Sequence, residues 1–173
     1  MVVLLLSLTT LFGASLVAVA VTRNAAKTWN SADLSLSGLW PGTAILLLLS
    51  VTMEHARARV ASNSQLGMQR ALWGAFGLGV AFLASQGLAF NREFSRVLVP
   101  AADALPLFGF VLLVSLHALH VVGGLIGLGL TIRRAARGDY SSSRAVGIRL
   151  TAQYWHFLAA IWLVLLAALY WIH

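Results

Sequence analysis

Histidines within long apolar stretches are the residues of this sequence best suited to chemistry. His117 and His120 lie three positions apart in the run Leu-His-Ala-Leu-His, and His156 lies in Tyr-Trp-His-Phe near the C-terminus. Ionisable groups inside a membrane span are expensive and are therefore functional candidates. A bis-histidine haem in a bundle takes its ligands from two helices, so His156 could pair with either of the others. Hydrogen bonding between helices or to lipid headgroups is the simpler interpretation, and we favour it.

Other metal or catalytic chemistry has little support in the sequence. Carboxylate-bridged di-iron sites in helical bundles use Glu-x-x-His pairs, and no Glu stands three residues before a His. The chain also has no cysteine, which excludes disulfides, iron–sulfur clusters and thiol catalysis. We therefore expect no catalytic residue, no metal site and no cofactor bound by this chain.

The composition places these histidines in an integral membrane protein. Of the 173 residues, 60% are apolar and only 10% are charged, against about 25% charged in soluble domains. Five stretches of at least 20 residues contain no charged residue: 1–22, 34–53, 71–91, 104–132 and 150–173. A helix needs about 20 apolar residues to cross a bilayer. The sequence therefore predicts an all-α bundle of five transmembrane helices, forming a single domain over residues 1–173.

Turn-forming residues set the expected helix boundaries. Pro41 suits the first turn of the second helix, where its missing N–H is harmless, and Ser62-Asn63-Ser64 marks the turn that follows. Residues 138–143 form the last loop. The expected helices cover about 1–22, 36–58, 69–91, 106–133 and 149–172.

Basic residues are divided unevenly among the loops. The loops after the second and fourth helices hold eight arginines against two acids, whereas the other two hold four basic residues against three acids. Because cytoplasmic loops carry the excess of Lys and Arg, we expect the N-terminus in the cytoplasm and the C-terminus outside. The net charge of +7 has the same explanation, so we expect no nucleic-acid partner.

Glycines recur at a spacing that suits close helix packing. Gly38 and Gly42 form one pair four residues apart, and Gly123 and Gly127 form another. Small residues at this spacing let two helix backbones approach closely in a membrane. We expect both pairs to contact helices, either of this chain or of a partner.

Three motifs together resemble one family of membrane proteins, haem-copper oxidase subunit III. Residues 116–124 read Leu-His-Ala-Leu-His-Val-Val-Gly-Gly and are similar to the family's Phe-His-Gly-Leu-His-Val-x-Gly-Gly. Residues 154–162 begin with Tyr-Trp-His-Phe and end with Trp, as in the family's last helix. Residues 50–56, Ser-Val-Thr-Met-Glu-His-Ala, follow Pro41 much as in the family's Pro-Asn-Thr helix. The resemblance covers essentially the whole chain and is to the five-helix form, which lacks the two N-terminal helices of the seven-helix form.

The departures from the family pattern concern buried carboxylates. Where the family has two Glu and one Asp within its helices, this sequence has Leu8, Ala89 and Ala159. In the family such groups are thought to help supply protons to the catalytic subunit. Their loss leaves the packing and lipid-binding roles intact, because removing buried charges is often neutral for stability.

The resemblance implies a non-catalytic accessory subunit of a respiratory haem-copper terminal oxidase in the bacterial inner membrane. Such a subunit would stabilise the catalytic subunit, bind phospholipid and support proton uptake, while haem and copper would belong to the catalytic partner. The electron donor, cytochrome c or quinol, stays open. The residues expected at contacts between helices, with lipid or with other subunits are Ser50, Thr52, His55, Gln86, His117, His120, Gly123, Gly127, Tyr154, Trp155, His156 and Trp162.

Two other functions remain open at this stage. The first is a haem-b membrane anchor that passes electrons to or from quinone, which needs histidines facing each other across helices. The second is an accessory subunit of another membrane complex, such as a nitric oxide reductase. A partner that does not pump protons would not need the missing carboxylates.

Overall fold

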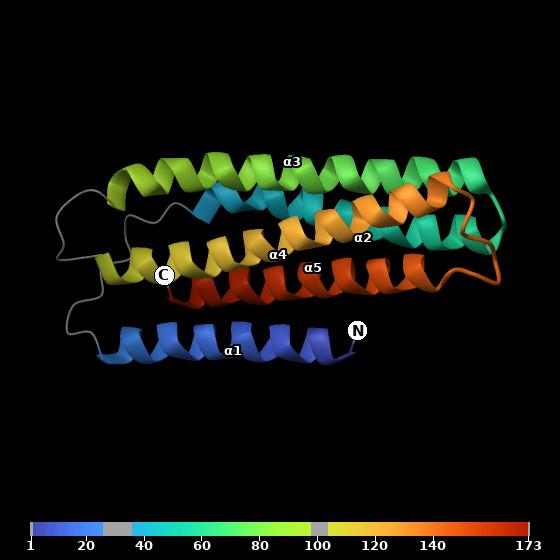
Figure 1. Cartoon of the computed structure of the whole chain (residues 1–173). Coiled ribbons are helices and arrows are strands. Elements are labelled where there is room, and N and C mark those ends of the chain that lie inside the picture. Colours follow the sequence, from blue (N-terminus) through green and yellow to red (C-terminus); the bar gives the residue numbers. More distant parts are fainter. Residues whose placement is uncertain (1, 26–35, 98–103, 173) are drawn as a thin grey trace.

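The chain forms a bundle of long helices (Figure 1). The computed structural model describes residues 2–25, 36–97 and 104–172, and these residues contain no strand. The helices are α1 (Val2–Ala25), α2 (Trp40–Ala61), α3 (Gln65–Val97), α4 (Ala104–Ala136) and α5 (Val146–Ile172), with a short 3-10 helix η1 (Leu36–Leu39) before α2. The prediction of an all-α fold with five helices is confirmed.

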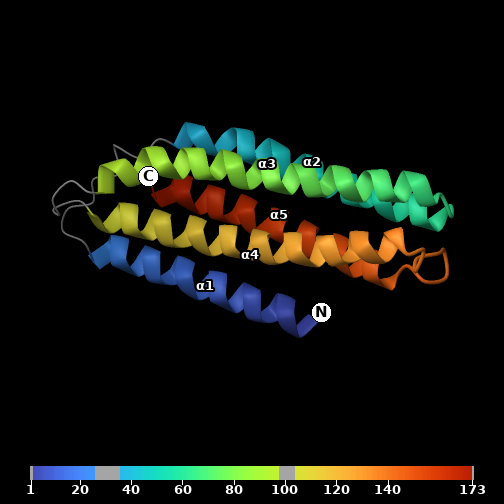
Figure 2. The same ribbon diagram turned by 45° about the horizontal axis from the view of Figure 1, so that its top comes forward.

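Four of the helices enclose the core, and the fifth lies outside them. Each of α2, α3, α4 and α5 packs against two of the others in a closed ring, α2–α3–α4–α5 and back to α2. Helix α1 packs instead against α4 and α5 and lies alongside them in both ribbon views (Figures 1 and 2). The core therefore belongs mainly to the four-helix ring.

Four described helices are long and apolar enough to cross a membrane: Leu5–Asn24, Gln65–Asn91, Val111–Ala136 and Val146–Trp171. Helix α2 is not among them, although the sequence predicts a fifth span there. The charge-free stretch 34–53 begins before α2, so only the residues of α2 that precede Glu54 are free of charge. Histidine and arginine residues in the last two turns of α2 reduce its hydropathy further.

The helices extend beyond the boundaries expected from the sequence. Helices α3 and α4 each have 33 residues, whereas about 23 and 28 residues were expected from 69–91 and 106–133. The additional residues at the start of α3, 65–68, mix polar and apolar side chains, and those at the end of α4 include Arg134; all of them are helical. Polar and charged residues can continue a helix beyond its apolar length, so charge patterning underestimates helix length.

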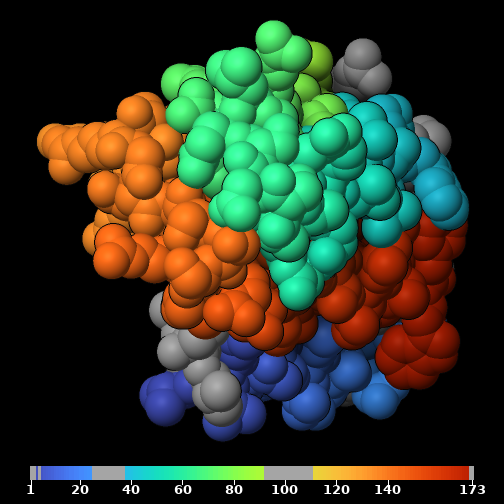
Figure 3. Space-filling view, turned by 90° about the vertical axis from the view of Figure 1, so that its right-hand side faces the viewer, coloured from blue at the N-terminus to red at the C-terminus, as the bar shows by residue number. Residues whose placement is uncertain are grey.

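The two arginine-rich loops lie at the same end of the bundle. Helix α2 ends at Ala61, and Asn63 takes a left-handed conformation with φ of 53°, which confirms the expected turn. The Asn63 side-chain oxygen accepts a hydrogen bond from the backbone N–H of Ser142 at 2.9 Å, and Gln65 Nε2 donates to the Tyr140 carbonyl at 2.7 Å. Figure 3 views this end, with the α2–α3 turn beside the orange α4–α5 segment.

Candidate functional site

His117 on α4 lies in a closed aromatic cluster inside the bundle. Its ring is 5.0 Å from that of Trp162, 5.8 Å from Phe82 and 6.1 Å from Phe12, measured between centroids. The side chain is 0% exposed, and neither ring nitrogen has a hydrogen-bond partner. Because the neighbours come from α1, α3 and α5, His117 joins four helices through ring contacts alone.

A buried hydrogen bond links α2 and α5 beside this cluster. Trp162 Nε1 donates to Thr43 Oγ1 at 2.9 Å, and the Thr43 hydroxyl donates in turn to the Leu39 carbonyl at 2.9 Å. Both side chains are buried. A buried indole N–H usually finds such a partner, and here the bond fixes the position of the large ring that covers His117.

Helices α2 and α3 approach each other closely at Gly42. A side-chain carbon at this position would lie 2.0 Å from Gln86 Nε2 and 3.0 Å from Ser85 Oγ. The Gln86 amide is buried, and neither its oxygen nor its nitrogen has a partner. Gly38 also lies near α3, 3.4 Å from the Ala89 Cβ by the same measure. The first predicted glycine pair therefore contacts α3.

The second predicted glycine pair, on α4, does not lie on the face of α4 that packs against α5. Gly123 and Gly127 are exposed, and a Cβ on Gly127 would meet nothing within 4 Å. Gly124 is the close contact instead, because its Cβ would lie 2.9 Å from Tyr154 Cε1 and 3.2 Å from Trp155 Cζ2. Tyr154 also donates a hydrogen bond to the His120 carbonyl at 2.9 Å, which ties α4 to α5.

A polar cluster, separate from the aromatic cluster around His117, lies between α2 and α5 on the outer surface of the bundle. His156 Nε2 bonds to Glu54 Oε1 at 2.5 Å, and Arg57 Nη1 donates to the same oxygen at 2.6 Å. The other ring nitrogen of His156, Nδ1, bonds to the Ser50 hydroxyl. Glu54 and His156 remain 49% and 33% exposed. Both nitrogens of this histidine are therefore in use.

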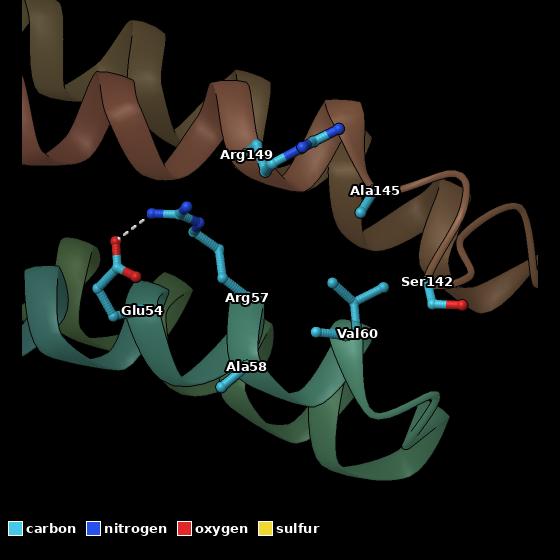
Figure 4. A pocket seen from close by; sticks show the side chains of 8 residues that line it. Glu54, Arg57, Ala58, Val60, Ser142, Ala145 and Arg149 are labelled. Carbon is cyan, nitrogen blue, oxygen red and sulfur yellow. Dashed lines mark hydrogen bonds and ion pairs between the residues drawn. The ribbon is translucent and has the colours of Figure 1, made fainter.

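A cavity of about 350 Å³ extends from this cluster toward the arginine-rich end. Its walls are the last two turns of α2, from Glu54 to Ala61, and the start of α5 with the loop before it, including Ser142 and Arg149. Figure 4 shows the Glu54 carboxylate paired with Arg57 on one wall and Arg149 on the wall opposite. Glu54 is the lining residue farthest from the end of α2.

The predicted site residues divide by depth in the bundle. Four are buried: Gln86, His117, Trp155 and Trp162. Five are partly buried: Ser50, Thr52, His120, Tyr154 and His156. Three are exposed: His55, Gly123 and Gly127. The buried ones make contacts between helices. Trp155 is an example: it is 0% exposed and packs against Gly124 of α4.

The pairing that a bis-histidine haem needs is not formed in this structure. His156 uses both ring nitrogens in bonds to α2, and His117 is covered by three aromatic rings. His120 bonds through Nδ1 to the Leu116 carbonyl and contacts the Phe12 ring at 5.3 Å. A haem bound at His117 would have to displace at least one of the three rings packed against it, so the packing of these residues does not favour the haem-b alternative.

Sequence reasoning missed three residues that complete these sites. Thr43 holds Trp162, Phe82 packs against His117, and Glu54 binds His156. Thr43 and Phe82 carry no signal beyond ordinary core composition. Glu54 did carry one, because it is an acid one helical turn after Ser50 and adjoins a long apolar run.

Comparisons with known proteins give the chain a family. Residues 6–173 match the family model described as cytochrome c oxidase subunit III. The chain is similar to the cytochrome c oxidase subunit 3 of Artemia franciscana, with 31% identity over 82% of this chain and 58% of that protein. For the Synechocystis protein of the same name the identity is 28%, over 76% of this chain and 56% of that protein.

A further relative is the probable cytochrome c oxidase subunit 3 of Nocardia farcinica, 25% identical over 81% of this chain and 68% of that protein. The chain spans little more than half the length of several of these relatives, 58% and 56% for the first two described. The family match nevertheless covers nearly every residue, including the aromatic cluster around His117 and the polar cluster around Glu54 and His156. The chain therefore belongs to the cytochrome c oxidase subunit III family.

Proposed function

We propose that this chain is a non-catalytic accessory subunit of a respiratory haem-copper terminal oxidase, stabilising the catalytic subunit and holding no redox cofactor itself. The observation that carries the proposal is the family match over residues 6–173. The interior supports it, because the histidines there serve in ring packing or in bonds between helices. Haem and copper would then be held by the catalytic partner.

The proposed location is the bacterial inner membrane, with the arginine-rich end in the cytoplasm. Relatives from Synechocystis and Nocardia show that the family occurs in bacteria, and the helices indicate a multi-pass membrane protein. The α2–α3 and α4–α5 loops share one end of the bundle, so the positive-inside rule can act on both at once. This orientation places the N-terminus inside and the C-terminus outside.

Support of proton uptake, if the subunit provides it, must use groups other than the family's carboxylates. Leu8 and Ala159 are buried apolar residues here, and Ala89 is partly buried against the bundle. Glu54 is the carboxylate that adjoins the membrane-spanning core, and it is bonded to His156. We therefore place stabilisation of the complex first and proton support second among the proposed roles.

Phospholipid binding is proposed for the opposite side of the bundle. A mostly apolar cavity of about 390 Å³ lies between α3 and α4, lined by Leu83, Phe90, Val114, Leu119 and Val122 among others. Its apolar lining suits an acyl chain, since hydrocarbon is the solvent at this depth. Gln86 adds one buried amide to this wall.

Affinity purification tests the proposed function directly. The tagged chain is extracted from its native membrane in a mild detergent, and the co-purifying proteins are identified by mass spectrometry. Recovery of a large, histidine-rich catalytic oxidase subunit is the expected result. Recovery of the chain alone, or with a nitric oxide reductase in place of an oxidase, would overturn the proposal. A matched sample tagged on an unrelated membrane protein identifies non-specific contaminants.

A further inference from the structure

The outer surface of α2 and α5 differs from the other membrane-facing surfaces of the bundle. Glu54 and His156 are partly exposed there and are joined to each other at 2.5 Å. The neighbouring outward residues on the same two helices are apolar, for example Leu47, Val51 and Leu163. We call the surface formed by Leu47, Val51, Glu54, His156 and Leu163 the α2/α5 face.

The charged pair lies deeper than the arginines that mark the end of the bundle. At 1.5 Å per residue, Glu54 is about 5–8 Å before Arg57 and Arg59 along α2, and His156 is about 10 Å beyond Arg149 along α5. His156 also lies within the candidate span Val146–Trp171. Glu54 is bonded to His156 and therefore lies beside this span, where an exposed carboxylate is unfavourable unless another polar group covers it.

The α3 and α4 surfaces show the contrast. Outward residues on these two helices include Trp73, Val80, Leu119 and Ile126, all of them exposed and apolar. Such side chains suit lipid, because hydrocarbon offers no hydrogen-bond donor and these residues need none. The two sides of the bundle therefore place different demands on what surrounds them.

We propose that the α2/α5 face is the docking surface for a membrane-spanning helix of the partner oxidase subunit, and that this helix presents a hydrogen-bond donor to Glu54. This inference rests on the proposed function, because the proposed function supplies the partner subunit. Glu54 Oε1 already accepts bonds from Arg57 and His156, while Oε2 has no hydrogen bond within the described part of the chain. The free oxygen therefore accepts the partner's donor.

Charge and geometry favour a protein helix over lipid at this surface. An acyl chain offers no donor to the Glu54 carboxylate, and a lipid phosphate would be attracted to Arg57 and Arg149 inside the α2–α5 cavity rather than to the apolar α2/α5 face. Helix α1 does not fill the place, because it packs on the α4 and α5 side of the bundle. Figure 3 shows α2 (cyan) and α5 (red) meeting along the right-hand side, away from α1 (blue).

Photocrosslinking in native membranes tests the assignment. A benzoylphenylalanine is introduced at Val51 or at Leu163 on the α2/α5 face, and at Leu119 or Ile126 on α4 as matched controls of similar exposure. After irradiation, proteins joined to the tagged chain are identified by mass spectrometry. The expected result is an adduct with an oxidase subunit from Val51 and Leu163, and none from the two α4 positions.

The contrary outcomes are distinct. Oxidase adducts from the α4 positions alone would overturn the docking surface and leave the proposed function standing. Adducts from Val51 or Leu163 with a protein that is not an oxidase subunit would overturn the proposed function. Failure of Val51 and Leu163 to form any protein adduct, in membranes from which the tag recovers the oxidase, would show that lipid or water covers the α2/α5 face and would overturn the inference.

Discussion

His117 and His156 are two histidines of the same bundle in opposite surroundings. His117 is wholly buried among Phe12, Phe82 and Trp162, and neither ring nitrogen has a hydrogen bond. His156 is one-third exposed, and both of its nitrogens are bonded, one to the Ser50 hydroxyl and one to the Glu54 carboxylate. One acts as an aromatic ring, and the other acts as a polar connector.

The difference shows how one residue type serves two purposes in a membrane bundle. Inside, the flat ring of His117 fills a space between aromatic side chains, and the contacts of its ring stabilise the packing. Outside, His156 holds a carboxylate in place at a depth where charge is expensive. We therefore expect substitutions in the aromatic cluster to act mainly on the stability of the bundle, and substitutions at the Glu54–His156 pair to act mainly on partner binding.

The largest effect is expected from Trp162→Ala, which breaks the inner cluster. Truncating a buried aromatic residue leaves a cavity and typically costs about 3–5 kcal/mol, and here it also removes the donor to Thr43. The free energy of unfolding of the isolated chain in detergent should fall by that amount. Trp162→Phe, which keeps a ring and loses the N–H, should cost about 1 kcal/mol. Equal losses in both variants would contradict the packing role of the ring.

A smaller loss is expected from Gly42→Leu, with Gly127→Leu as its control. The new side chain at Gly42 would collide with the Gln86 amide, and overpacking of this kind costs about 1–3 kcal/mol. At Gly127 nothing lies within 4 Å of the added carbon, so the thermal stability of the isolated chain should not fall, and it should rise slightly because glycine is unfavourable within a helix. Destabilisation by Gly127→Leu in the isolated chain would show that the inner and outer glycine faces are wrongly assigned.

The outer cluster should respond in the opposite manner. Glu54→Leu should weaken retention of the partner about three- to thirty-fold, the range that corresponds to interhelical hydrogen bonds of about 0.6–2 kcal/mol in membranes. Stability of the isolated chain should change by less than about 1 kcal/mol, because the ion pairs of Glu54 are exposed there. Competitive recovery of wild-type and variant chains with the oxidase measures the first quantity. If Glu54→Leu lowers the stability of the isolated chain but keeps its partner, the contrast between the inner and outer clusters is wrong.

The smallest effect is expected from His117→Leu. Leucine has a similar volume, and the substitution removes two buried nitrogens that have no partner. Loss of ring contacts and relief of unpaired polar groups oppose each other, so the free energy of unfolding should change by no more than about 1 kcal/mol. A loss of more than about 2 kcal/mol would mean that the nitrogens are bonded, for instance to ordered water.

The sequence predicts the helices well because charge is excluded from their apolar lengths. The runs around 71–91, 104–132 and 150–173 each give one long helix, and the Asn63 turn lies where its residues indicate. The helix ends were predicted less well, since α3 begins at Gln65 and α4 continues to Ala136, beyond the expected ranges 69–91 and 106–133. Charge patterning indicates where the apolar length ends, but the helical backbone continues beyond that point.

The functional clusters could be predicted only in part. The motifs identify His117, His156 and Trp162, but their roles depend on partners far away in sequence. Glu54 and His156 are 102 positions apart, and Thr43 and Trp162 are 119 apart. No periodicity in one segment reveals such a pair. The choice between Gly123 and Gly124 likewise depends on the rotation of α4 against α5, which the spacing of glycines does not specify.

A reduced-minus-oxidised visible spectrum tests the central claim most directly. The tagged chain is purified with its partner, the spectrum is recorded per mole of chain, and the measurement is repeated after the partner has been removed with a harsher detergent. We expect haem bands in the complex and none in the isolated chain, because the cofactors belong to the catalytic subunit. Haem bands that stay with the isolated chain would contradict the accessory role and would restore the haem-b anchor as its function.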